Sequence, residues 1–236
     1  MNDLYKINDD LLDFINSISQ NSPELYKKIL LGPTEINNIN KAVECMRAGG
    51  IVIFFSFATY GIAANAWLEE SVKKVYEIKY REKNKPLTIM TNKDKYQSIV
   101  DLTDDVKSLV SKLTQQFWPG NIGIVCNKNK EQIPDYVNSA FETINMTCMD
   151  LSSEMLAQAA DFPIAITSAN YSGFEPAKDS YMAIDYFKDE EKIDLFLLGP
   201  PSPIGMNTTM VKITHPDNLE ILREGPLTKE EILSKI

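Results

Sequence analysis

Apolar residues along the chain recur with two periods, one typical of helices and one typical of short buried strands. Helical spacing and capping residues predict helices over 34–47, 69–80, 103–117, a segment starting at Ser152, 180–187 and a last helix capped by Thr228. Runs of β-branched and aromatic residues predict strands over 51–57, 87–90, 122–126, 143–148, 163–167 and 194–198, and a hairpin over 208–213 and 219–222. Because helices alternate with strands but some strands are consecutive, the pattern predicts an α/β fold with a mixed, twisted sheet.

The first part of the chain has a pattern of its own. Residues 1–33 are predicted as a helical N-terminal appendage, because LLDFINSI has helical spacing and Ser22-Pro23-Glu24 is typical of a helix start. Gly32-Pro33 closes this segment, and residues 34–236 are predicted as the main domain. An appendage of this kind would cover a cavity or mediate dimerisation.

Composition narrows the class of protein. With 236 residues and 44% hydrophobic residues, the chain can bury a sizeable core. The N-terminus carries aspartates where a secretory signal would be basic, and no run approaches the roughly 18 apolar residues of a membrane span, so we expect a cytoplasmic protein without a membrane partner. Three widely spaced cysteines argue against a disulfide framework or a zinc cluster. The single histidine, His215, precedes a proline in a polar turn, which favours a solvated position.

Positive charge gathers in one stretch of a chain whose net charge is −9. Between Val72 and Tyr96 there are eight lysines or arginines and three acids. This contrast predicts a local anionic ligand, whereas a surface that coats nucleic acid is more usually basic throughout. Lys79, Arg81 and Lys85 surround a predicted turn that can direct them toward one point, where arginine offers a planar fork to phosphate oxygens.

Three other stretches place small polar residues beside predicted strands. In ITSANYSG, from Ile166 to Gly173, a buried strand runs into hydroxyl and amide side chains. Ligands usually bind at such strand ends in α/β sheets, although a simple turn has the same composition. The segment 205–211 again sets hydroxyls beside a strand, and Arg223 leaves a strand just before Gly225.

Taken together, these stretches resemble the YrdC-like family of threonylcarbamoyl-adenylate synthases. The resemblance covers about residues 35 to 226 and rests on Tyr60-Gly61, EIKYREKNKPL, Trp118-Pro119-Gly120, ITSANYSG, Thr208-Thr209 and ILREG. It implies a twisted open mixed sheet with flanking helices around a concave, positively charged cavity. It also implies an enzyme, a nucleotidyltransferase that converts ATP, bicarbonate and L-threonine to threonylcarbamoyl-AMP and pyrophosphate with Mg²⁺, for tRNA modification.

The resemblance also implies roles for particular residues. Lys79 and Arg81 would be catalytic and would face the triphosphate. The ATP-binding set would comprise Lys79, Arg81, Lys85, Ser168, Asn170, Thr209 and Arg223. The acceptor side would comprise Ser56, Tyr60, Thr147 and Thr167. Attack on the α-phosphate needs neutralised leaving-group charge and aligned groups, which cations and N–H donors supply without a nucleophilic side chain. No residue is expected to ligate a metal directly.

The sequence departs from the family pattern on the acceptor side. Phe55-Ser56-Phe57-Ala58 stands where members usually carry Pro-Thr-acid-Thr, and Thr147 stands where a Val-Arg pair commonly ends. A cation that could face a carboxylate is therefore missing. Two hypotheses stay open: L-threonine is still the acceptor, or a less polar acceptor has replaced it, with Phe55 and Phe57 lining its pocket.

A second functional class also stays open. A non-catalytic module could use the same basic cavity for a nucleotide or for double-stranded RNA. Retention of both ITSAN and the Lys-x-Arg stretch favours the enzyme, whereas the changed acceptor side favours the binding module. For the enzyme, the expected partners are its small-molecule substrates, RNA and a separate transferase that receives the product.

Overall fold

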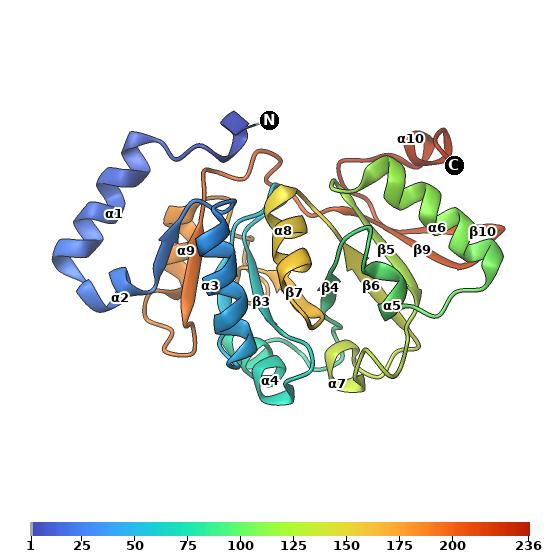
Figure 1. Cartoon of the computed structure of the whole chain (residues 1–236), viewed down its shortest axis with the longest axis horizontal. Helices are drawn as coiled ribbons and strands as arrows, with labels where there is room; N and C mark the ends of the chain where they lie inside the picture. Colours follow the sequence, from blue (N-terminus) through green and yellow to red (C-terminus); the bar gives the residue numbers. More distant parts are fainter. Residues whose placement is uncertain (1) are drawn as a thin grey trace.

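The computed structural model describes residues 2–236 and confirms the predicted α/β class (Figure 1). Its helices are the 3₁₀ helix η1 (Asn2–Tyr5) and the α-helices α1 (Asp9–Asn21), α2 (Pro23–Lys27), α3 (Ile36–Arg47), α4 (Glu69–Ile78), α5 (Tyr96–Ile99), α6 (Asp104–Phe117), α7 (Asp135–Asn138), α8 (Leu151–Ala159), α9 (Ser180–Phe187) and α10 (Lys229–Leu233). Its strands are β1 (Ile29–Leu31), β2 (Val52–Phe54), β3 (Gly61–Asn65), β4 (Thr88–Met90), β5 (Ile122–Asn127), β6 (Thr143–Thr147), β7 (Ile164–Ser168), β8 (Leu195–Leu198), β9 (Thr209–His215) and β10 (Asn218–Arg223).

All the strands join one mixed sheet, which confirms the predicted architecture. Their order is β1-β8-β2-β3-β7-β4-β6-β5-β9-β10. β3 runs antiparallel to β7, with Ala63 opposite Ile166, whereas β4 runs parallel to β6, with Ile89 opposite Met146. The long order and the two unpaired edges make the sheet open, and it twists as extended strands of L-residues do.

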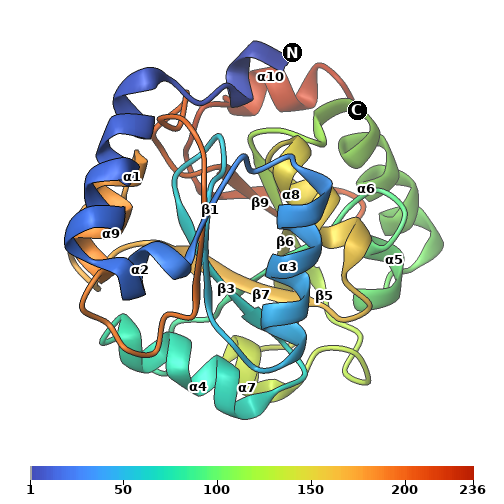
Figure 2. The ribbon, with the colours of Figure 1, turned by 60° about the vertical axis from the view of Figure 1, so that its left-hand side comes forward.

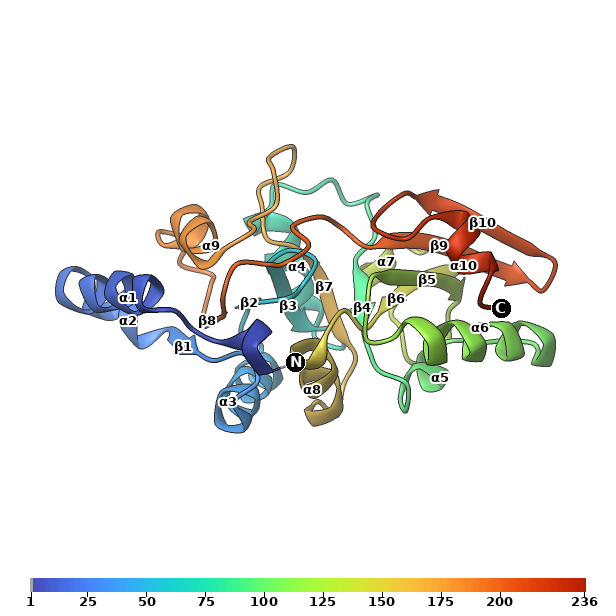
Figure 3. The ribbon, with the colours of Figure 1, turned by 90° about the horizontal axis from the view of Figure 1, so that it is seen from above.

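Helices cover both sides of this sheet. In Figure 3, α3, α8, α5 and α6 lie on one side of the strands, and α4 and α9 lie on the other. α3 and α8 bury Val43, Met46 and Leu156 in one apolar cluster with Ala63 and Ile166 of the central strands. Among residues 2–236, every helix is too short or too polar to cross a bilayer.

Most of the predicted elements appear close to their predicted bounds. The helix predicted after Thr103 and the one predicted over 180–187 match α6 and α9, and Thr228 forms the predicted capping box at α10. The strand predicted over 51–57 is shorter, because the hydroxyl of Ser56 bonds the carbonyl of Thr59 and turns the chain back toward β3. β3 itself was not predicted, since its sequence GIAAN has neither β-branched enrichment nor alternation.

The N-terminal segment packs onto the main sheet. Helices occur at 9–21 and 23–27, as predicted, but Ile29–Leu31 forms strand β1, which pairs in parallel with β8. Figure 2 shows α1 beside α9, where the rings of Phe14 and Tyr181 lie 4.5 Å apart. The boundary between an appendage and a main domain near residue 33 stays a prediction, and Met1 lies outside the described residues.

Candidate functional site

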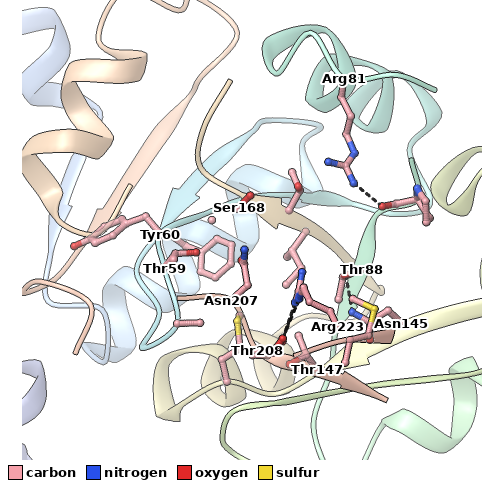
Figure 4. A pocket seen from close by; sticks show the side chains of 18 residues that line it. Thr59, Tyr60, Arg81, Thr88, Asn145, Thr147, Ser168, Asn207, Thr208 and Arg223 are labelled. Carbon is pink, nitrogen blue, oxygen red and sulfur yellow. Dashed lines mark hydrogen bonds between the residues drawn. The ribbon is translucent and has the colours of Figure 1, made fainter. Parts of the chain in front are cut away.

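A cavity of about 180 Å³ opens where several strands and loops end. Its lining comes from β2 and the turn that follows, from the segment after α4, and from β4, β6, β7, β9 and β10 (Figure 4). The lining residues are Phe54, Ala58, Thr59, Tyr60, Gly61, Arg81, Pro86, Thr88, Asn145, Thr147, Met149, Ile166, Thr167, Ser168, Asn207, Thr208, Met210 and Arg223. Segments distant in sequence therefore converge on one hollow.

Arg81 reaches the cavity because of the way α4 ends. The backbone N–H of Arg81 bonds the carbonyl of Tyr76 and that of Tyr80 bonds Glu77, which is the Schellman arrangement with Tyr80 in the left-handed conformation at φ 50°. The Arg81 guanidinium then donates from Nε to the carbonyl of Lys85 and from Nη2 to that of Pro86, at 3.2 and 2.9 Å. Nη1 is left to face the hollow (Figure 4). Burial lowers the pKa of Arg81, but an arginine remains charged.

Arg223 enters from the end of β10 in a similar way. Its Nε and Nη2 both donate to the carbonyl of Thr208, at 3.1 and 2.8 Å. The loop from β8 to β9 that carries Thr208 runs past the middle strands (Figure 3) and also brings Asn207 to the cavity. Figure 4 shows Arg81 and Arg223 directed toward the same central space from two sides. Backbone carbonyls thus orient both guanidinium groups before any ligand arrives.

Lys79 lies behind the cavity wall, at 1% exposure. Its ammonium contacts the carbonyl of Ser168, the carbonyl of Asn170 at 2.7 Å and the Asn170 Oδ1 at 3.0 Å. The hydroxyl of Ser168 donates to the same Oδ1 at 2.6 Å. Burial, and secondly the charge of Arg81, lower the pKa of Lys79 to about 7. The structure thus brings Lys79, Ser168 and Asn170 together, as predicted, but only Ser168 lines the cavity.

Neutral polar side chains occupy the part of the cavity near β4 and β6. The amide of Asn145 donates to the hydroxyl of Thr88 at 2.9 Å, and the hydroxyl of Thr147 donates to the carbonyl of Ile122 at 3.2 Å. The Oδ1 of Asn145 is buried against Gly123 and has no hydrogen-bond partner among the described residues. Thr147, which stands where family members commonly carry an arginine, lines the cavity.

The predicted site residues divide into two groups. Arg81, Thr147, Thr167, Ser168 and Arg223 line the cavity. Tyr60 contributes its backbone, since its buried hydroxyl bonds the Gly199 carbonyl at 2.7 Å and the ring points away in Figure 4.

The second group lies outside the lining. Lys85 is solvent-exposed and pairs with Glu82, whereas the buried hydroxyl of Thr209 bonds the backbone of Leu227. Ser56 is buried within its turn, and Asn170 serves Lys79 and its own loop. Phe54 lines the cavity in place of the predicted Phe55 and Phe57, which pack with Tyr5.

Several lining residues were not predicted. They are Thr59, Thr88, Asn145, Asn207 and Thr208. For β6 a signal existed, because Thr143-Ile144-Asn145-Met146-Thr147 alternates polar with apolar residues and so places Asn145 on the face of Thr147. For Thr208 the pair Thr208-Thr209 was noticed, but the sequence did not show which hydroxyl faces inward.

The charge of this cavity defines what it can bind. Two arginines line it, and no Asp or Glu is among the lining residues that the structure describes. Fixed guanidinium forks with hydroxyl and amide groups are suited to phosphate or carboxylate oxygens. Fold and site together define an α/β protein with a cavity, formed by strand ends and loops, whose charged lining residues are two arginines.

Comparison with known proteins agrees with this class. The Sua5/YciO/YrdC family model, described as "Telomere recombination", matches residues 44–225. The chain belongs to this family. It is 30% identical over 196 residues to a threonylcarbamoyl-AMP synthase of Bacillus subtilis, covering 82% of this chain and 55% of the relative. It is 32% identical over 186 residues to a putative threonylcarbamoyl-AMP synthase of Methanocaldococcus jannaschii, covering 78% of this chain and 84% of the relative.

A solved structure gives the same result. The crystal structure of P. abyssi Sua5 complexed with L-threonine matches with a TM-score of 0.77 at 26% identity, covering 88% of this chain and 59% of that one. The chain spans about half the length of several of these relatives, including those from Bacillus subtilis and Pyrococcus abyssi. The match therefore concerns the domain described here.

Proposed function

We propose that the chain is an ATP-dependent enzyme that joins an amino acid, bicarbonate and AMP into a carbamoyl-type adenylate and releases pyrophosphate. L-Threonine is the proposed acceptor, and the reaction class is nucleotidyl transfer. The observation that carries the proposal is the pair of arginines, Arg81 and Arg223, held by backbone carbonyls and directed into one cavity. Relatives that are named threonylcarbamoyl-AMP synthase support it.

The chemistry needs little more than positioning and charge. The amino group of the amino acid and bicarbonate first form a carbamate with loss of water. A carbamate oxygen then attacks the α-phosphorus, the bond from that phosphorus to the oxygen it shares with the β-phosphorus breaks, and pyrophosphate leaves with the electron pair. Arg81 and Arg223 would hold phosphate oxygens and neutralise the charge of the leaving group. Thr167 lies on the same wall and would add a hydroxyl contact to the phosphates, whereas the hydroxyl proton of Ser168 is already donated to the Asn170 Oδ1. None of these roles requires a proton to be taken by a protein side chain.

Magnesium would enter with the nucleotide. Mg²⁺ is usually held by one or two carboxylates together with substrate phosphates. The described cavity lining has no carboxylate, so in this proposal the triphosphate and water would supply most of the magnesium ligands. We therefore assign no step to a protein-bound metal.

The acceptor side keeps both earlier hypotheses. The part of the cavity formed by Thr88, Asn145 and Thr147 is neutral, so an acceptor carboxylate would share Arg223 with the nucleotide. Met149, Ile166 and Met210 add apolar surface to the cavity, which would suit an aliphatic side chain. Threonine, with a methyl and a hydroxyl group, satisfies this combination, and so does a less polar amino acid.

We further propose that the adenylate is passed in the cytoplasm to a separate transferase that acts on tRNA. A mixed anhydride of carbamate and phosphate hydrolyses readily, which favours direct transfer to a partner. A non-catalytic nucleotide- or RNA-binding module remains the competing hypothesis, but no contact among the described residues favours it over the enzyme.

The test is pyrophosphate release. The full chain is incubated with ATP, Mg²⁺, bicarbonate and, in turn, L-threonine, L-serine, L-valine or no amino acid. We expect release that depends on both bicarbonate and an amino acid, with threonine among the active acceptors. Nucleotide binding without release for any acceptor would refute the enzyme and leave the binding module.

A further inference from the structure

Lys79 is a buried cation whose ammonium contacts Ser168 of the cavity wall, yet Lys79 does not itself line the cavity. Its side chain is 1% exposed. Arg81, two residues further along the chain, does line the cavity and keeps a free Nη1 toward the hollow. A lysine ammonium has three donors. All three are taken by oxygens of one loop: the carbonyls of Ser168 and Asn170 and the Asn170 Oδ1. A phosphate would therefore have to displace contacts that already satisfy the charge.

The backbone of Lys79 is tied to the same loop. Its carbonyl accepts a hydrogen bond from the N–H of Ser172 at 2.8 Å. Four hydrogen bonds thus join Lys79, the last residue before the left-handed turn of α4, to the segment 168–172. Two neighbouring walls of the cavity are connected in this way, the turn that carries Arg81 and the loop that follows β7.

The connection reaches the cavity through one shared atom. The Asn170 Oδ1 accepts from Lys79 on one side and from the hydroxyl of Ser168 on the other. The amide Nδ2 of Asn170 holds the carbonyls of Tyr171 and Phe174, which completes the loop. The direction in which Ser168 presents its hydroxyl oxygen to the cavity therefore depends on the position of Lys79.

We infer that Lys79 is a positioning residue, which sets the wall formed by Ser168 and Asn170 against Arg81 and does not itself bind the phosphates. The role of Lys79 in nucleotide binding rests on the proposed function, whereas its hydrogen bonds to the 168–172 loop do not depend on that proposal. This differs from the direct phosphate contact that the sequence suggested for Lys79. In this arrangement Asn170 supports the wall without lining the cavity.

The two roles predict different behaviour of the ligand-free protein. A phosphate ligand can be removed without changing the loop. Removal of the positioning ammonium takes one donor from each of three oxygens. The Ser168 carbonyl keeps the N–H of Asn170 and the Asn170 Oδ1 keeps the Ser168 hydroxyl, but the Asn170 carbonyl loses its ammonium partner, so the loop opens more often even when no ligand is present. The ammonium of Lys79 contacts no carboxylate within residues 2–236, and the positive charge of Arg81 lowers its pKa further. The charge of Lys79 is therefore stabilised by the carbonyl and amide oxygens of the loop alone.

The first experiment is amide hydrogen exchange on the ligand-free full chain. Lys79→Met keeps an unbranched stem as long as the lysine carbons and removes the ammonium with its donors. Lys73→Met is the matched control, an exposed lysine of the same helix that pairs with Glu69 and Glu70. We expect K79M to speed exchange of the amides of 169–174 by about tenfold or more and K73M by less than about twofold. Unchanged exchange in K79M together with lost ATP affinity would overturn the inference and restore a direct contact.

A second measurement covers the case in which K79M does not fold. Lys79→Arg keeps a cation that stays charged at every accessible pH. The low pKa of Lys79, about 7, means that its charge is present below that pH and lost above it. The ratio of the amide exchange rates of residues 169–174 in the ligand-free wild-type chain to those in ligand-free K79R is expected to rise at least about threefold between about pH 6 and about pH 9. A ratio that is independent of pH would count against the inference.

Failure of the proposed function and failure of the inference about Lys79 can be told apart. If the wild-type chain binds no ATP, the proposed function fails, whereas hydrogen exchange still decides whether Lys79 holds the loop. If ATP binds, the double variant K79M with Ser168→Ala adds a further check. Because Lys79 acts through Ser168, the two effects on affinity should combine to clearly less than their product. Multiplicative effects would show that they act separately.

Discussion

Replacement of Arg81 by alanine separates the two tasks that its guanidinium performs. Arginine has five N–H donors, of which Nε–H and one on Nη2 hold the carbonyls of Lys85 and Pro86. The others, including both on Nη1, remain for a ligand. Each hydrogen bond to a charged group contributes about 1.5 to 3 kcal/mol, so two such contacts to phosphate lost together, about 3 kcal/mol or more, weaken ATP binding by at least about 150-fold.

The effect on folding should be smaller. The two bonds to backbone carbonyls are partly solvated, and each contributes about 1 kcal/mol at most, so we expect R81A to lose about 1 to 2 kcal/mol of unfolding free energy. This exceeds the change of about 0.5 kcal/mol expected for an ordinary surface cation, because the guanidinium shapes the turn after α4.

The assay combines calorimetric titration with ATP and urea unfolding of the same preparations. Lys83→Ala is the control, since Lys83 is exposed in the same turn and does not line the cavity. The ratio of the ATP dissociation constants of R81A and the wild type should also fall as salt is raised, because salt screens the attraction between the guanidinium and the phosphates. Normal ATP affinity in R81A, at a stability that leaves it folded, would show that the cavity does not use this arginine for the nucleotide.

Three further predictions concern stability. Thr209→Val should cost about 2 kcal/mol in urea unfolding, because its hydroxyl pairs with both the N–H and the carbonyl of Leu227, while ATP affinity stays within about twofold. Burial raises the pKa of Asp150 to about 6, above its ordinary value, so the folded state binds the carboxyl proton more tightly than the unfolded state does. The free energy of unfolding should therefore rise by about 1 kcal/mol from about pH 7 to about pH 5. Thermal unfolding of Asp150→Asn over the same range should show no such rise. Tyr80→Gly should raise unfolding free energy by about 0.5 kcal/mol or more, since Tyr80 has φ 50° and is 80% exposed; a loss would mean that its contact with Tyr171 outweighs the strain.

The fold could be predicted largely from the sequence because the apolar periodicity is strong. α6 and α9 have a cap, an apolar stripe and a clear end, and their bounds follow from local signals. β3 is the exception. Its small residues are chosen by close packing, as at Gly61, where an added Cβ would meet the ring of Phe54 at 2.4 Å, and no local propensity reveals such a constraint.

The candidate site could be predicted as a set of segments but not as a set of side chains. Arg81 was predicted from the local excess of positive charge after the predicted helix, and Arg223 from the family resemblance, since an arginine at a strand end is a weak signal by itself. Thr209 and Lys79 show the limit. Both lie in segments that the sequence assigned to the site, yet the polar groups of each form hydrogen bonds with the backbone of another loop. Such long-range partners become visible only when the fold brings residues 79 and 170, or 209 and 227, together.

The same contacts explain how an acidic chain keeps a cationic cavity. Many of the surface lysines are neutralised by a nearby acid, as Lys73 is by Glu69 and Glu70. Arg81 and Arg223 are instead fixed by carbonyl oxygens, whose partial charges orient a guanidinium without cancelling it. An acid in either place would hold the arginine equally well but would neutralise the field that an anion needs. Anchoring by backbone therefore preserves positive potential where the ligand binds, and the overall charge of −9 does not oppose it at short range.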